Sequence, residues 1–68
     1  MRRVMVSEYK KLGEDTFYTL VEKGEAVFHE FGVDFEELSD GNVTYSTAIV
    51  EYADGTVSNV AVDRIRFI

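Results

Sequence analysis

Residues 26–38, AVFHEFGVDFEEL, hold the chain's only histidine and four carboxylates, set among three phenylalanines. Imidazole and carboxylate groups together could bind a metal ion or exchange protons with a substrate. A histidine metal site usually needs a second nitrogen or sulfur ligand, and this chain has neither another histidine nor a cysteine. If the segment is a strand, His29 shares a face with the apolar Val27 and Phe31. We therefore predict that His29 is a structural side chain in the core or at an interface, and that it binds no metal.

The stretch DFEELSDGN, residues 34–42, has the composition of a calcium-binding loop. Placing Gly41 at the sixth position of an EF-hand loop puts Leu38 at the third position and Thr47 at the twelfth. Both positions require oxygen ligands, and the twelfth requires a bidentate glutamate. The pattern therefore fails as an EF-hand, and we expect no cofactor.

Nucleophilic catalysis needs a Ser, Cys or Thr beside a base that a third group orients. With one histidine, no cysteine and no Gly-x-Ser-x-Gly motif, the sequence supplies no such arrangement. The five glycines are dispersed at turns and form no phosphate-binding loop. A chain of 68 residues also leaves little volume for an enzyme pocket. We predict that the protein is not an enzyme and has no catalytic residue.

The acidic residues are concentrated in residues 14–40, where nine acids stand against Lys23 alone, a balance of −8. A field of that sign repels phosphate backbones and attracts basic protein surfaces, so we expect a basic protein partner and no direct nucleic-acid binding. The alternative is that the acids only keep a small protein soluble. The candidate partner-binding residues are three carboxylates on the outward side of the predicted strand and a fourth at its end: Glu30, Asp34, Glu36 and Glu37.

The chain is one small domain, and at 68 residues it can bury only ~60% of the surface that its unfolded state exposes. Because it has no cysteine, neither a disulfide nor a thiolate zinc site can stabilise it. We therefore expect a homodimer or higher oligomer, in which subunits bury surface against each other. No window approaches the ~18 apolar residues of a membrane helix, and no signal-peptide pattern follows the basic N-terminus. The expected location is cytoplasmic, without a membrane partner.

The clearest predicted element is a β-hairpin over residues 43–62, whose two halves are rich in β-branched and aromatic residues. Asp54-Gly55 favours a two-residue type I′ loop between them. Such a loop pairs Tyr52 with Val57, Val50 with Asn59, Ala48 with Ala61 and Ile49 with Val60. The following VDRIRFI predicts a tight turn at Asp63-Arg64 and a short strand with Ile65 and Phe67 on one side.

Residues 26–38 are predicted as a strand because Gly32 and the β-favouring phenylalanines disfavour a helix. Val27, His29, Phe31, Val33 and Phe35 then face one way, and Glu30, Gly32, Asp34 and Glu36 face the other. A helical turn near Glu36–Leu38 and a short helix across residues 16–23 remain as alternatives. Other turns are predicted at Gly13-Glu14-Asp15, Lys23-Gly24 and Ser39–Asn42. With RRVMVSEY as the first strand, the fold class is mainly β: a small SH3-like barrel or sandwich of five or six antiparallel strands, or an α+β fold if the short helix forms.

A hairpin, a single turn and a short closing strand over residues 47–68 resemble the C-terminal end of SH3-like and Tudor-like small barrels. Their aromatic binding groove and aromatic cage cannot be placed on this sequence, so the resemblance implies a fold only. The combination of FHEFGVDFEE, TAIVEYADGTV and VAVDRIRFI resembles small proteins encoded by bacteriophages and prophages. That resemblance implies an accessory protein in a bacterial host cytoplasm and identifies no functional residue.

Three functions are consistent with these observations. The first is a non-enzymatic interaction module, a phage accessory protein that binds a basic surface of a host protein through acidic segment 14–40. The second is a structural or assembly protein that self-associates through exposed strands. The third is a protein that binds a small ligand at a subunit interface.

Overall fold

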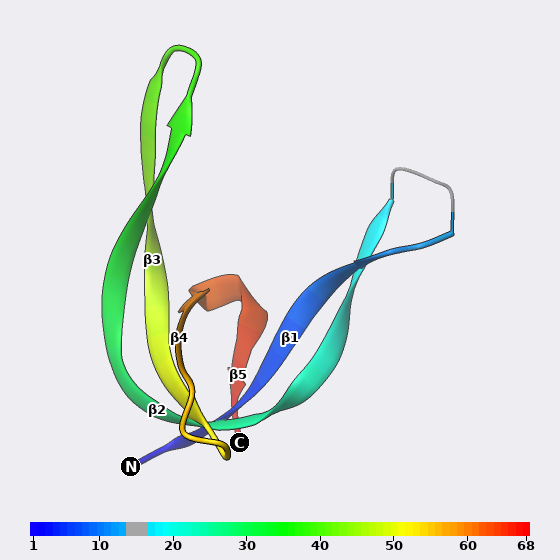
Figure 1. The fold of residues 1–68 in the computed structure, drawn as a ribbon, viewed down its shortest axis with the longest axis vertical. Helices are drawn as coiled ribbons and strands as arrows, with labels where there is room; N and C mark the ends of the chain where they lie inside the picture. The colour runs from blue at the N-terminus through cyan, green and yellow to red at the C-terminus, as the bar shows by residue number, and fades with distance from the viewer. Residues whose placement is uncertain (14–16) are drawn as a thin grey trace.

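The computed structural model describes residues 1–13 and 17–68 and contains one antiparallel sheet with strand order β4-β3-β2-β1-β5 (Figure 1). The elements are β1 (Arg3–Lys11), β2 (Tyr18–Leu38), β3 (Gly41–Tyr52), β4 (Val57–Ala61), the 3₁₀ turn η1 (Val62–Arg64) and β5 (Ile65–Phe67). The prediction of a mainly β domain with five strands is confirmed. Of the predicted turn at Gly13-Glu14-Asp15, the last two residues lie outside the described residues.

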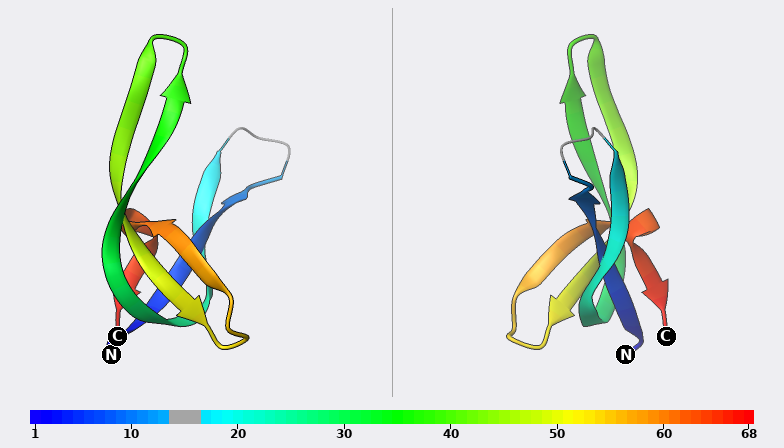
Figure 2. Two further views of the ribbon diagram at one scale, coloured as in Figure 1. Left: turned by 60° about the vertical axis from the view of Figure 1, so that its left-hand side comes forward. Right: turned by 90° about the vertical axis from the view of Figure 1, so that its right-hand side faces the viewer.

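β2 has 21 residues and runs through both of the hairpins that project from the sheet (Figures 1 and 2). The first half of β2 pairs with β1 and the second half pairs with β3. A helix across residues 16–23 is wrong from residue 18 onward, and a helical turn near Glu36–Leu38 is also wrong. Cross-strand pairing along the whole strand, in a segment with three Val and three Phe, explains why the extended conformation prevails.

Two β-bulges bend β2. At the first, Val6 pairs with Gly24 but Ser7 pairs with Glu22, which leaves Lys23 as an extra residue. The turn predicted at Lys23-Gly24 is therefore wrong, because the strand continues through this point. A bulge increases the local bend and twist of a strand, and β2 accordingly curves through the molecule in Figure 1.

The second bulge lies between Phe28, which pairs with Val50, and Glu30, which pairs with Ile49. Val50 and Ile49 are adjacent in β3 and point to opposite faces of the sheet. Phe28 and Glu30 therefore also lie on opposite faces, although two residues apart in a regular strand would share a face. His29 is the extra residue at this bulge.

The core is small and consists of small side chains. Partly buried aromatic and aliphatic residues pack against it: Phe28, Tyr52, Ile65 and Phe67. The buried hydrophobic residues are Val4, Val6, Ala26, Ala48, Val50 and Val60. They come from β1, β2, β3 and β4, so the core lies where these strands cross, at the centre of the sheet.

The β3–β4 hairpin forms where it was predicted, but its loop has three residues instead of two. Tyr52 donates its backbone N–H to the carbonyl of Thr56 at 2.9 Å, which leaves residues 53–55 as the loop. Gly55 has a φ of +87°, whereas Asp54 does not take the positive φ that a type I′ turn requires. Asp54 instead accepts a hydrogen bond from the N–H of Thr56 with its side chain, at 2.9 Å.

The extra loop residue shifts every predicted pair of this hairpin by one position. Ala48 pairs with Val60 instead of Ala61, and Val50 pairs with Ser58 instead of Asn59. A shift of one residue moves a side chain to the other face of a sheet. It places Val60 on the same face as Ala48, in the core.

The C-terminal turn and closing strand are confirmed. The 3₁₀ turn covers Val62–Arg64, and β5 pairs with β1 through Val4 with Phe67 and Val6 with Ile65. Ile65 and Phe67 pack against the core, as predicted from their alternation with the arginines.

Two two-stranded hairpins project from the sheet centre (Figures 1 and 2). The β2–β3 arm comprises residues 31–38 and 41–46, where only β2 and β3 pair, and the β1–β2 arm comprises residues 7–11 and 18–22. The Cα radius of gyration is 13.5 Å, whereas a compact chain of this length has about 10.9 Å. The arms therefore extend the molecule beyond the shape of a single packed core.

Candidate protein interface

Three of the four predicted carboxylates form a row on one face of the β2–β3 arm. Glu30 pairs with Ile49, Asp34 with Tyr45 and Glu36 with Val43, with no register shift between them. Residues at this even spacing share a face of the strand, as predicted. We call Glu30, Asp34 and Glu36 the acidic row.

Glu37, the fourth candidate, lies on the opposite face of the arm. It pairs with Asn42 and is one residue beyond Glu36, so its side chain points away from the acidic row.

The carboxylate of Asp34 accepts a hydrogen bond from the backbone N–H of Phe35 at 2.8 Å, which fixes the orientation of that carboxylate on the strand. Glu14 and Asp15 of segment 14–40 lie outside the described residues.

His29 does not lie among apolar side chains, and this part of the prediction is wrong. The bulge separates it from the face of Phe31, and its Nε2 lies 2.9 Å from Oε1 of Glu51 on β3. Both side chains are partly exposed, at 31% and 44%. In the described residues, no three His, Asp or Glu side chains are grouped as metal ligands are.

The phenylalanines that sequence reasoning assigned to the core are exposed. Phe31 is 60% exposed, Val33 71% and Phe35 57%. They lie on the β2–β3 arm, where, among residues 1–13 and 17–68, only β2 and β3 pair; the ring of Phe31 also lies near that of Phe67 in β5. The prediction that the face of Val27, His29, Phe31, Val33 and Phe35 is an inner face is therefore wrong beyond Val27, which is partly buried.

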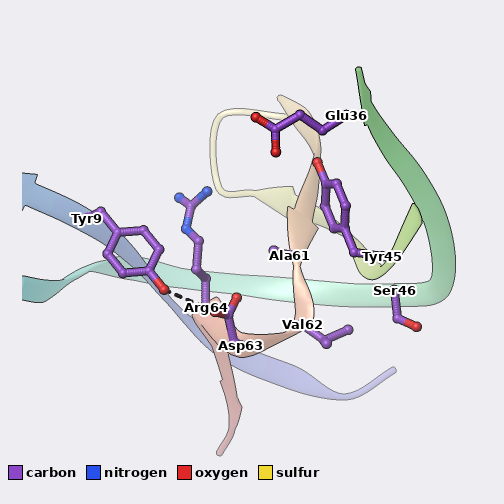
Figure 3. A pocket seen from close by; sticks show the side chains of 8 residues that line it. All are labelled: Tyr9, Glu36, Tyr45, Ser46, Ala61, Val62, Asp63 and Arg64. Atoms are coloured by element: carbon purple, nitrogen blue, oxygen red, sulfur yellow. Dashed lines mark hydrogen bonds between the residues drawn. The ribbon is translucent and has the colours of Figure 1, made fainter. Parts of the chain in front are cut away.

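A groove of about 570 Å³ lies between the two arms (Figure 3). Tyr9 comes from the β1–β2 arm, Glu36 and Tyr45 come from the β2–β3 arm, and Val62 and Asp63 of η1 lie between them. Glu36 of the acidic row thus borders a concave surface with two aromatic walls. Sequence reasoning missed this groove because Tyr9 and Tyr45 are distant in sequence and only the topology brings them together.

Hydrogen bonds hold the η1 side of the groove in place. The hydroxyl of Tyr9 donates to the carboxylate of Asp63 at 3.0 Å, and Nε of Arg64 donates to the carbonyl of Ser7 at 2.8 Å. The bond to Asp63 raises the pKa of Tyr9 above its ordinary value of 10.0, because the neutral phenol is the form that donates. Tyr9 therefore remains an uncharged hydrogen-bond donor at neutral pH.

β2 and β3 approach each other closely at Gly32, at the base of the β2–β3 arm. A Cβ at this position would lie 3.1 Å from Oγ1 of Thr47 and 3.4 Å from Cδ1 of Ile49. Thr47 is fully buried, and among the described residues its hydroxyl has no hydrogen-bond partner. Glycine at position 32 therefore leaves room for the side chains of β3 at the base of the arm.

The basic residues of the chain ends interact with neighbouring groups. Arg66 contacts Glu22 at 2.9 Å and Arg3 contacts Glu25 at 2.6 Å. The guanidinium of Arg2 lies 3.8 Å from the centre of the Phe67 ring. These arginine side chains therefore already contact partners on β2 and β5.

No protein-family model, curated protein or solved structure matches this chain. Within residues 1–13 and 17–68, no helix is long and apolar enough to cross a membrane.

Proposed function

We propose that this protein is a non-enzymatic interaction module that binds a protein partner with a basic surface through the groove between its arms and the adjoining acidic row. The observation that carries the proposal is the position of Glu36, which belongs both to the acidic row and to the wall of the groove. Tyr9 and Tyr45 supply the aromatic surface beside it.

The chemistry of the groove fits a cationic side chain. A lysine or arginine of the partner can lie against the ring of Tyr9 or Tyr45 and pair with Glu36. Arg64, the groove's own cation, already donates to the carbonyl of Ser7. The acidic row would then steer the basic partner toward the groove over the Debye length of the solution.

We also propose a fold type for the chain and a cellular compartment for its activity. The strand order β4-β3-β2-β1-β5, with a 3₁₀ turn before the closing strand, supports assignment to the SH3-like small barrels. The resemblance of residues 26–68 to phage-encoded proteins supports a bacterial host cytoplasm as the proposed setting and a host protein as the proposed partner. The groove needs no catalytic residue for this function.

Affinity capture from a bacterial lysate, followed by mass spectrometry, tests the proposal. The double variant Asp34→Lys/Glu36→Lys should lose most of the captured partner at low salt and keep its fold, because exposed charge changes usually alter stability by under ~0.5 kcal/mol. The matched control Glu8→Lys/Glu25→Lys makes the same change in net charge. Glu8 lies on the face of β1 opposite to Tyr9, and Glu25 lies outside the β2–β3 arm.

Capture by the native chain should also weaken steeply between ~50 and ~300 mM salt, because charge steering is screened. Equal loss of the partner in both double variants would show an effect of net charge alone. Equal capture by the native chain and Asp34→Lys/Glu36→Lys at low salt would refute the proposed function.

A further inference from the structure

The face of the β2–β3 arm opposite to the acidic row is apolar and continuous with the core. The ring centroids of Phe28 and Phe31 are 4.8 Å apart, and those of Phe31 and Phe67 are 6.5 Å apart. From Phe31 outward, Val33 and Phe35 continue this surface. We call Phe31, Val33 and Phe35 the apolar stripe.

The face that carries the apolar stripe has almost no charge. Glu37, near the tip, is its one charged side chain among the paired residues of the arm. Its β3 side consists of small polar residues, Asn42, Thr44 and Ser46. A basic partner finds few counter-charges on this face, whereas a second copy of the chain meets little charge repulsion there.

The accessible surface of the whole chain exceeds that of a compact monomer by about the area that a second copy would cover. The accessible surface is 5133 Å², and a compact monomer of 7.7 kDa exposes about 4,300 Å². The difference, about 800 Å², equals the area that each partner buries in an interface of standard size. A two-stranded hairpin is also marginally stable by itself in water, so the arm gains most from being covered.

Charge repulsion between acidic rows limits how the β2–β3 arms of two copies can pack. Pairing of the free β2 edges would bring the acidic rows of two copies to a strand spacing of about 4.8 Å, where like charges destabilise. Packing the apolar stripes face to face instead leaves both acidic rows on the outside. The two sheets would then be about 10 Å apart, as in other packed sheets.

We propose that two copies of this chain form a symmetric dimer in which the apolar stripes of their β2–β3 arms pack face to face. The acidic row remains exposed in this dimer, as does the groove except at its edge by Ser46, which lies on the stripe face. Each dimer therefore presents two copies of the acidic row, and this inference does not depend on the proposed function.

Sedimentation velocity of the purified chain tests the dimer. The native chain should sediment as a dimer at about 100 µM, and raising the salt concentration should not dissociate it, because charge screening reduces the repulsion between two acidic chains. Val33→Glu places a charge in the apolar stripe and should raise the dimer dissociation constant at least about tenfold.

Val43→Glu is the matched control, with the same substitution on the same arm. Val43 pairs with Glu36, so it lies on the face of the acidic row and its variant should remain dimeric. Circular dichroism checks that both variants keep the fold. A native chain that is monomeric at about 100 µM, or equal dissociation of the two variants, would overturn the inference.

Discussion

The sheet centre and the β2–β3 arm place their apolar side chains in opposite ways. At the centre, six valines and alanines are buried where four strands cross. On the arm, Phe31, Val33 and Phe35 are more than half exposed. Both regions belong to the same continuous strands, β2 and β3.

This difference separates the residues that fold the chain from those that are free to bind. Small side chains suffice at the centre, because closely crossing strands leave little volume between them. An exposed apolar patch on a small soluble domain typically marks an interaction site. On the arm, Phe31, Val33 and Phe35 are therefore candidates for binding, whereas Phe28 of the same strand packs against the core.

The largest expected effect comes from placing one charge in each region. Val50 is fully buried, so Val50→Asp should cost over ~3 kcal/mol and abolish cooperative unfolding. Phe35→Asp on the arm should cost the monomer under ~1 kcal/mol, since the site is already solvated. Thermal melts in dilute solution, followed by circular dichroism, measure both. Similar losses in the two variants would remove the distinction between centre and arm.

The next effect concerns the exposed loop between β3 and β4, two strands that contribute to the core at the sheet centre. Gly55→Val forces a β-branched side chain to adopt a φ of +87° and should cost over ~1 kcal/mol in the free energy of unfolding. Urea unfolding measures the change. An unchanged urea midpoint would show that this loop does not hold the register of the hairpin.

The smallest effect is a pH dependence at the same loop. The backbone N–H of Thr56 lowers the pKa of Asp54 below its ordinary value of 3.8, because it bonds to the charged form. The carboxylate therefore stabilises the fold above pH 3.8, and this contribution is lost as the pH falls through the lowered pKa. Asp54→Ala should melt below the native chain at pH 7, and the difference should shrink as the pH falls below 3.8. A difference that stays the same as the pH is lowered would assign the effect to packing.

Sequence reasoning predicted the mainly β class, the β3–β4 hairpin and the closing turn, because these depend on local residue types. Turn residues at Asp54-Gly55 and the alternation of Ile65 and Phe67 carry their information within a few positions. The acidic row also followed from alternation, since β2 is regular from Glu30 to Glu36.

The parts that sequence reasoning missed depend on bulges and on topology. One extra residue at His29 reverses the alternation between Phe28 and Glu30, and no local pattern indicates where a bulge falls. One extra loop residue likewise moves Val60 into the core. The exposure of Phe35 could not be foreseen because a hydrophobic residue predicts burial only where another element covers it.

Hydrogen–deuterium exchange of the native chain at two concentrations tests most directly whether the centre folds the chain and the arm binds. Amides around Val4 and Val50 at the centre should exchange slowly at both ~1 µM and ~100 µM protein, because they report the folding of one chain. Amides of residues 31–38 in the β2–β3 arm should exchange quickly at ~1 µM and slowly at ~100 µM, where a second copy covers the apolar stripe. Protection of residues 31–38 that is equally strong at both concentrations would contradict this division of the molecule.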